Sequence, residues 1–465
     1  MNDPVMNDPV INDPAMNHTD IFQTSDAHGA SYDAKRRVVV TGGGWSGIAA
    51  ALSACKAGAD VILIEKTDLL LGLGNVGGIM RNNGRFVGAE ENIALGASEL
   101  FAITDRLSRH RGIDFPGHKH ASLYDVIKVE PAVRRLVQEM GIEIHLMSRV
   151  TDVVHEETPD GVKLVKSVST ADGETIEGDV FIDTTGSTGP MGNCLTYGSG
   201  CAMCILRCAA FGPRVSITKK LGLEDIMGQR SDGAFGAFSG SCKLEKASLS
   251  DDIVRMLDET GVAVIPLDKE LINRDKLNLK VCQQYALDEY AENIILLDTG
   301  YAKLMTPFFP LHKLRLVPGF ENARYADPYA GGKGNSIRYL SVAQRDNCMR
   351  VKGAHNLFCG GEKSGLFVGH TEAITTGSLA GHNAVRLIKS MPLLELPHGL
   401  AAGDLIAFAN RQMESEEGLK TRYTFAGAEY FERMKEKGLY TTDPEEIKRR
   451  VRRYGLEGIY SERLL

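Results

Sequence analysis

The feature that most constrains the fold is a glycine-rich segment between two apolar runs. Residues 36–41 read RRVVVT, a β-branched run that predicts a buried strand, and residues 42–47 read GGGWSG. An alanine-rich helical stretch follows over residues 48–57. Residues 60–64 (DVILI) then predict a second buried strand, which ends in Glu65. This order of strand, glycine turn, helix and strand predicts one βαβ unit.

The spacing Gly42-x-Gly44-x-x-Gly47 is typical of a dinucleotide-binding turn. Gly42 permits a tight turn, Gly44 lets the backbone approach a pyrophosphate, and Gly47 lets helix and strand pack closely. Free N–H groups and the positive dipole end of the helix then face the phosphates. Glu65 lies 23 residues after Gly42, where it would bond the ribose hydroxyls of an adenosine. The sequence therefore favours a bound dinucleotide over a purely structural turn.

A second glycine triplet, Gly72-x-Gly74-x-x-Gly77, begins seven residues after Glu65. No new strand and helix bracket it, so we predict a loop beside the cofactor and not a second nucleotide fold. The chain is thus predicted to lack the second nucleotide domain of a pyridine-nucleotide-dependent disulfide reductase.

Two later segments each predict a buried strand that ends in a small-residue turn. They are residues 179–189 (DVFIDTTGSTG) and residues 356–365 (NLFCGGEKSG), the latter followed by a small-residue helix over 371–385. Here the sequence resembles the two-dinucleotide-binding-domain flavoproteins. The resemblance implies FAD as the cofactor, with Gly361 and Glu362 as contacts. It also implies that the positive end of the helix stabilises negative charge on a reduced flavin.

The resemblance narrows in the second half of the chain. Residues 318–325 (PGFENARY), 335–339 (NSIRY) and 377–387 (GSLAGHNAVRL) are similar to the C-terminal half of the glucose-inhibited-division-protein-A group. That group includes the flavin- and folate-dependent tRNA uridine methyltransferases. The likeness spans residues 36 to about 390, and it implies methyl transfer to RNA as an alternative activity.

A cysteine cluster is the main candidate for catalysis. Gly200-Cys201, with residues 211–213 (FGP) and 221–225 (LGLED), resembles the stretch around the nucleophilic cysteine of those methyltransferases, which implies Cys201 as the nucleophile. Those enzymes carry a second cysteine in the loop after the first βαβ unit, whereas residues 73–86 here contain none. We take Cys201 and Cys204 as the predicted catalytic residues.

Three interpretations of this cluster remain open on the residues alone. Offsets of 0, 3 and 7 would place Cys201, Cys204 and Cys208 on one helix face, where free thiols pack as small apolar groups. Cys201 and Cys204 would otherwise form a redox pair near the flavin, with Arg207 lowering a thiol pKa. Cys194 would make a fourth ligand for an iron–sulfur cluster, although the spacing differs from ferredoxin runs.

Histidines and basic residues elsewhere carry weaker signals. His118 and His120 lie in a polar stretch (GHKH) and are predicted to be surface residues, not metal ligands. His370 precedes the last predicted cofactor helix and would lie near the flavin or cap that helix. The basic run at 448–453 (KRRVRR) follows Glu445 and Glu446 by one turn, so we predict a solvated helix with i,i+4 pairs and not an RNA-binding patch.

Charge, apolar runs and cysteine content indicate which kinds of partner and which compartment to expect. The net charge of −7 does not favour a nucleic-acid binder, so RNA is a possible but not a favoured partner. No apolar run of spanning length and no basic-then-apolar leader are seen, and the nine cysteines fit a reducing compartment. We therefore expect a cytoplasmic chain with a small-molecule substrate or electron donor, no bound metal, no membrane partner, and homo-oligomers as a possibility.

The predicted fold class is α/β, with a discontinuous Rossmann-like FAD-binding domain, an inserted α+β substrate domain and a C-terminal helical appendage. The expected boundaries are a flexible tail at 1–33, the FAD-binding domain at 34–190 and 346–395, the substrate domain at 191–345, and the helical segment at 396–465. The predicted activity is that of an FAD-dependent oxidoreductase. The predicted cofactor contacts are Gly42, Gly43, Gly44, Ser46, Gly47, Glu65, Lys66, Val150, Gly186, Gly361 and Glu362.

Overall fold

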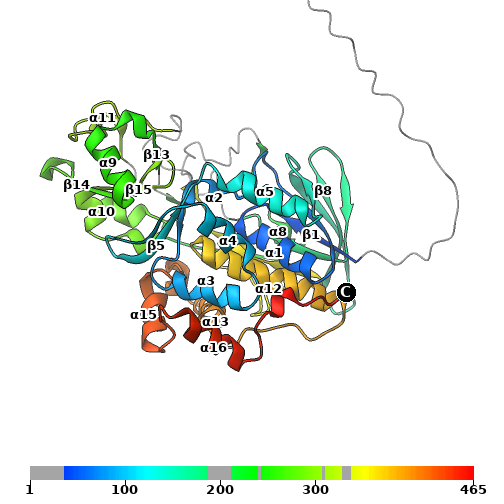
Figure 1. The fold of residues 1–465 in the computed structure, drawn as a ribbon. Helices are drawn as coiled ribbons and strands as arrows, with labels where there is room; N and C mark the ends of the chain where they lie inside the picture. Colours follow the sequence, from blue (N-terminus) through cyan, green and yellow to red (C-terminus); the bar gives the residue numbers. More distant parts are fainter. Residues whose placement is uncertain (1–35, 187–210, 239–241, 306–308, 327–336) are drawn as a thin grey trace, which may run out of the picture. The chain divides into compact units, whose positions relative to one another are not determined.

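A five-stranded parallel sheet lies at the centre of the fold (Figure 1). The computed structural model describes residues 36–186, 211–238, 242–305, 309–326 and 337–465. The strands lie in the order β19-β10-β1-β2-β6, and each neighbouring pair is parallel. The chain runs from β1 through β2 to β6 and then crosses to β10 and β19, so the order reverses at β1. Ligands of such sheets bind at this reversal, at the carboxyl ends of the strands. The bounds are β1 (Arg37–Thr41), β2 (Asp60–Ile64), β6 (Glu143–His145), β10 (Val180–Asp183) and β19 (Leu357–Cys359).

Alternate residues of β1 serve two different cores. Val38 and Val40 pack with helices α1 (Trp45–Lys56) and α12 (His370–Ile388) on one face of the sheet. Val39 belongs to the core on the opposite face, which an antiparallel sheet of three strands covers. Because both faces are covered, the central strands are apolar throughout, as expected for a parallel sheet. The covering strands are β7 (Val150–Glu157), β8 (Lys163–Thr170) and β9 (Thr175–Glu177).

Helices α12 and α1 lie side by side (Figure 1), and two glycines of α12 allow their close approach. A Cβ placed on Gly377 would lie 2.1 Å from the carbonyl oxygen of Ser46, and one on Gly381 would lie 2.1 Å from that of Ala50. The close packing also brings the two helix N-termini together. The rings of their first residues, Trp45 and His370, have centroids 5.7 Å apart.

The remaining strands form small antiparallel sheets beside this core. A four-stranded sheet in the order β13-β16-β15-β14 packs against α9 (Asp251–Thr260), and a three-stranded sheet has the order β3-β5-β4. Two strand pairs complete the set, β11 with β18 and β12 with β17. The bounds are β3 (Ile79–Met80), β4 (Ser108–Phe115), β5 (His118–Tyr124), β11 (Asp225–Met227), β12 (Ala237–Phe238), β13 (Cys242–Leu244), β14 (Val262–Pro266), β15 (Asn293–Asp298), β16 (Ala302–Leu304), β17 (Ile337–Arg338) and β18 (Ser341–Ala343).

Helices make up the C-terminal segment. They are α13 (Ala401–Gln412), α14 (Glu416–Lys420), α15 (Ala428–Glu436) and α16 (Pro444–Arg453), and Figure 1 shows α13, α15 and α16 near α3 (Arg85–Ala94). The other described α-helices are α2 (Gly74–Gly77), α4 (Glu99–Arg106), α5 (Val129–Glu139), α8 (Ile217–Lys220), α10 (Glu289–Glu292) and α11 (Leu311–Leu314). Among the described helices, none has the length and apolar character needed to cross a bilayer.

The α/β fold with a parallel sheet and a helical C-terminal region is confirmed. Residues 36–465 form one compact unit, and the boundaries between FAD-binding and substrate domains stay predictions. The chain breaks at Gly96 between α3 and α4 and then enters β4. One local expectation was wrong. His118 is not a surface residue, because it is 1% exposed in β5 and its Nε2 lies 3.1 Å from the carbonyl oxygen of Gln284.

Glu91 of α3 joins this helix to the C-terminal segment and supplies a pH-dependent contact. Its buried carboxylate accepts hydrogen bonds from the backbone N–H groups of Ala401 and Ala402, each 2.8 Å long, at the start of α13. Arg450 of α16 lies 3.7 Å away. Burial raises the pKa of Glu91 to about 7, although the two N–H donors and Arg450 act to lower the pKa.

We expect the Glu91 carboxyl to make the unfolding free energy fall as pH rises from 4.5 to about 7. In this window the folded state binds the proton more tightly than the unfolded state, so stability is lost on ionisation. The loss is on the order of 3 kcal/mol, at about 1.4 kcal/mol per pH unit. Urea unfolding across this window should show the decline in the wild type and a flatter profile in Glu91→Gln. Equal slopes in both proteins would contradict the assignment.

Candidate functional site

The glycine turn after β1 has the geometry that a dinucleotide requires. Gly42 has φ +103°, and a Cβ there would lie 2.5 Å from the carbonyl oxygen of Thr184. A Cβ on Gly47 would lie 1.8 Å from the carbonyl oxygen of Gly42, whereas one on Gly44 would meet nothing within 4 Å. Gly42 and Gly47 are therefore needed for packing, and Gly44 leaves open space before the N-terminus of α1. This division matches the three roles predicted from the spacing.

Glu65 lies at the end of β2 and faces the same cavity as the glycine turn. Its carboxylate accepts hydrogen bonds from the backbone N–H groups of Gly43 (2.7 Å) and Thr67 (2.9 Å). Burial raises the pKa of Glu65, and these N–H donors oppose the rise. The two bonds fix the carboxylate and leave its remaining lone pairs free to accept from ribose hydroxyls.

The late glycine turn after β19 meets the first turn of α1. A Cβ on Gly361 would lie 2.9 Å from the Cβ of Ser46, and the Gly361 N–H donates to Thr376 Oγ1 of α12 at 2.8 Å. The Ser46 hydroxyl is buried and has no hydrogen-bond partner in the described part of the chain. A phosphate oxygen over the first turn of α1 would accept a hydrogen bond from this hydroxyl. This unpaired hydroxyl, together with the open space at Gly44, fits the pyrophosphate of FAD.

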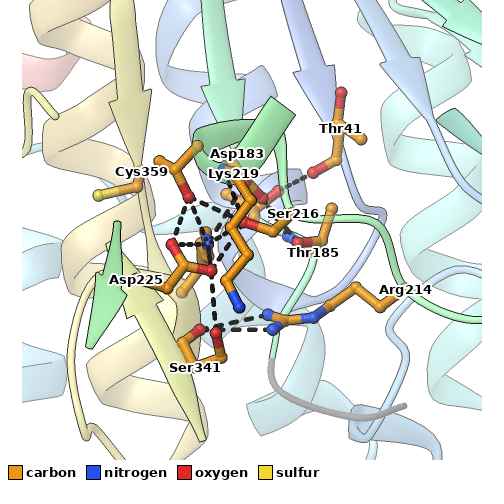
Figure 2. Close-up of polar contacts among 12 residues, drawn as sticks. Thr41, Asp183, Thr185, Arg214, Ser216, Lys219, Asp225, Ser341 and Cys359 are labelled. Carbon is orange, nitrogen blue, oxygen red and sulfur yellow. Dashed lines mark hydrogen bonds and ion pairs between the residues drawn. The ribbon is translucent and has the colours of Figure 1, made fainter. Parts of the chain in front are cut away.

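A buried ion network holds the late turn in place (Figure 2). The Lys363 ammonium donates to both carboxylate oxygens of Asp225 at 2.8 Å and lies 3.9 Å from Asp183 at the end of β10. Ser216 and Ser341 also donate to Asp225, at 2.7 and 2.8 Å. Burial alone would raise the pKa of Asp225, but Lys363 lowers that pKa to about 2. The network therefore joins three separate chain segments behind the cavity wall.

Arg214 lies beside this network and lines the cavity (Figure 2). Its side chain is 2% exposed, and its guanidinium donates two long hydrogen bonds, of 3.4 and 3.5 Å, to the carbonyl oxygen of Ser341. Among the described residues, no carboxylate pairs with Arg214 within 4 Å and its Nε finds no acceptor. Arg214 thus offers donors to an anionic or polar part of the cofactor.

The cavity continues past the glycine turns to a region that we call the inner end. Its wall is formed by Arg85, Gln284, Tyr285, Lys303, Arg338 and His370. His370 begins α12, and its Nδ1 lies 3.3 Å from the Tyr124 hydroxyl oxygen. Burial and then the charges of Arg85, Lys303 and Arg338 hold the pKa of His370 well below its usual range. The imidazole is therefore neutral at neutral pH.

The structure brings most of the predicted cofactor contacts to one cavity. The residues that line it are Gly42, Gly44, Ser46, Glu65, Lys66, Val150, Gly186, Gly361 and Glu362. Gly43 and Gly47 stand behind the wall and shape it through the contacts described above. The second glycine triplet also reaches the cavity through Gly72, Gly74 and Gly77, although Gly74–Gly77 form the short helix α2 and not the predicted loop. The cysteines of the cluster, Cys194, Cys201, Cys204 and Cys208, lie outside the described residues, so their predicted roles stay predictions.

Several residues of the inner end were assigned no role from the sequence. Arg85, Lys303 and Arg338 come from α3, β16 and β17, which are far apart along the chain. Cys282, a thiol that also lines the cavity, stands alone in the sequence and outside the cluster. One usable signal existed, because Lys303 interrupts the short apolar run of residues 301–305 (YAKLM).

Comparison with known proteins agrees with this geometry. Residues 37–189 match a family model described as FAD dependent oxidoreductase, and residues 298–392 match one described as glucose inhibited division protein A. Among solved structures, GidA of Aquifex aeolicus in its form II crystal has a TM-score of 0.61 and 16% identity, covering 91% of this chain and 77% of that chain. The form I crystal gives a TM-score of 0.55 and 16% identity, with coverages of 90% and 78%.

At such identity the likeness to solved structures is one of fold. The first family match covers the glycine turn, Glu65 and β10, and the second covers the late turn and α12. The two matches therefore fall on the two halves of the cavity wall that fit FAD. The chain is an FAD-dependent oxidoreductase that resembles the glucose inhibited division protein A group.

Proposed function

We propose that this flavoprotein oxidises or reduces a small organic molecule held at the inner end of its cavity. The observation that carries the proposal is that one cavity reaches from the nucleotide-binding turn to the inner end. Bound FAD supplies the two-electron redox chemistry. The glycine turn and Ser46 would hold its pyrophosphate, Glu65 its ribose, and Gly361 and Glu362 the part between pyrophosphate and flavin.

The chain's own groups suit the inner end to hold a substrate. Tyr285 is buried and His370 is half-buried, and the neutral imidazole of His370 has one nitrogen to donate and one to accept a hydrogen bond. The positive end of α12, a helix of 19 residues, begins at His370 and favours negative charge nearby. We also propose a reducing, cytoplasmic setting, which four free thiols among the described residues support: Cys55, Cys282, Cys348 and Cys359.

A second candidate is folate-dependent methyl transfer to an RNA uridine, with Cys201 as the nucleophile. The family match over residues 298–392 favours this alternative. The basic run at 448–453 gives it little support, because acidic partners accompany these residues. Arg450 pairs with Glu446 at 3.6 Å, and Arg452 donates to Glu457 at 2.8 Å.

One experiment separates the two candidates. The FAD-loaded protein is mixed without oxygen with small organic donors, and the visible flavin absorption is followed. Bleaching by a small molecule in the absence of RNA, reversed by an acceptor, is the expected result. Retention of RNA at low salt, with methyl transfer from a folate and no small-molecule turnover, would establish the second candidate instead. The same spectrum would reveal an iron–sulfur cluster as absorption beyond that of the flavin.

A further inference from the structure

Positive charge at the inner end exceeds the negative charge that the described residues provide. Arg85 pairs with Glu372 at 3.1 Å, and Arg338 pairs with Glu362. Lys303 lines the same wall, but no carboxylate of the described ranges lies within 4 Å of its ammonium. Both carboxylates are thus engaged by the two arginines, and Lys303 is left as an additional cation.

Lys303 is buried in a way that is costly without a counter-ion. Its side chain is 3% exposed in the middle of β16, and its ammonium donates one hydrogen bond, to the carbonyl oxygen of Val76. Lys280, also 3% exposed, donates to the carbonyl oxygen of Met305 just behind the wall. Burying an ammonium without an ion partner costs several kcal/mol. Burial lowers the pKa of Lys303 to about 7 and that of Lys280 to about 8.

The residues around Lys303 also indicate which other groups its ligand would carry. An ammonium has three donors, and the described residues use one of them. The wall next to it is apolar and aromatic, with buried Ile79, Tyr285, Met305 and Val368. The buried side-chain oxygen of Gln284 has no hydrogen-bond partner in the described structure, so it can accept from a donor on the ligand.

We propose that the inner end binds the carboxylate of a small organic acid, with Lys303 as its ion-pairing residue. The inference rests on the proposed function, since it names the class of that substrate. A single available ammonium suits a monoanion, because the guanidinium groups of Arg85 and Arg338 already serve Glu372 and Glu362. The apolar wall would take the carbon skeleton of the acid. Lys303 is then a residue that determines substrate specificity.

The test uses the FAD-loaded protein, with benzoate as the probe and its neutral analogue benzyl alcohol as the comparison. Binding is followed by the flavin difference spectrum and by the fluorescence of Trp45. This residue is the only tryptophan of the chain, and it lines the cavity. We expect saturable benzoate binding and at least about tenfold weaker binding of the alcohol, as a charge-assisted hydrogen bond predicts.

The Lys303→Met variant should bind benzoate about 10- to 100-fold more weakly. Lys352→Met, at an exposed position, is the matched control and should bind like the wild type. The thermal midpoint of unliganded Lys303→Met should equal or exceed that of the wild type, because a buried unpaired charge is removed. A merely structural lysine would give a lower midpoint and unchanged affinity.

Equal binding of benzoate and benzyl alcohol by the wild type would overturn the proposal, and this comparison needs no variant. Unchanged benzoate affinity in Lys303→Met, or tighter binding of inorganic phosphate than of benzoate, would also overturn it. Any of these results would leave the proposed oxidoreductase function standing if small neutral donors bleach the flavin. Failure of that function appears separately, as a flavin that no small molecule bleaches.

Discussion

Replacing Gly44 by valine is expected to weaken FAD binding by about 100-fold or more, which corresponds to about 3 kcal/mol. Gly44 precedes α1 with an extended backbone, φ −71° and ψ −179°, which valine also adopts. A Cβ at this position meets no atom within 4 Å. It would instead occupy the space through which the pyrophosphate approaches the backbone. Titration of the apoprotein with FAD, followed by flavin fluorescence, gives the dissociation constant.

The fold itself should tolerate Gly44→Val. Glycine before a helix is a moderate cap and valine a poor one, so the unfolding free energy of the apoprotein should fall by no more than about 1 kcal/mol. Gly47→Ala is the contrasting variant, because its Cβ would lie 1.8 Å from the carbonyl oxygen of Gly42. It should destabilise the apoprotein by about 3 kcal/mol. A wild-type dissociation constant for FAD in Gly44→Val would show that the dinucleotide does not cross this turn.

The nucleotide end of the site could be predicted because its signals are local in sequence. Gly42, Gly44 and Gly47 act through backbone that lies within a few residues, and Glu65 reaches the turn through a hydrogen bond from Gly43. The order of strand, turn and helix in the sequence therefore predicts most of the geometry of the nucleotide-binding turn. The late turn was found through its resemblance to flavoproteins, and the structure brings it to Ser46 of the first turn.

The inner end could not be predicted in the same way, because long-range packing creates it. Lys303 lies in a strand of three residues, and Arg85 belongs to no motif. Arg338 lies within the segment 335–339 that carried the resemblance, but the sequence assigned it no role. Several strands of residues 242–305 span only three residues, which is too short for a period of two to appear in the sequence. His118 looked like a surface residue from its polar neighbours, but the rings of Phe115 and Tyr285 pack against it and it is buried.

The Arg85→Met substitution is expected to lower the unfolding free energy by about 3–5 kcal/mol, since it leaves a buried carboxylate without its cation. The Glu372 side chain is fully buried, and both its oxygens lie 3.1 Å from Arg85 Nε. Glu372 also accepts from the Thr424 hydroxyl (2.7 Å) and the Phe425 N–H (2.8 Å). This one carboxylate therefore joins α3, α12 and the C-terminal segment. Urea unfolding of the apoprotein measures the loss.

The double variant Arg85→Met/Glu372→Gln should recover more than half of that loss. A neutral amide removes the buried charge, and its oxygen still accepts from the Phe425 N–H. Arg255→Met is the matched control, because Arg255 pairs with Asp252 on the surface, where the two side chains are 62% and 81% exposed. Its effect should stay within about 0.5 kcal/mol. If Arg85→Met were as stable as the wild type, Glu372 could not be a buried anion, and Arg85 rather than Lys303 would be the cation free to pair with a ligand.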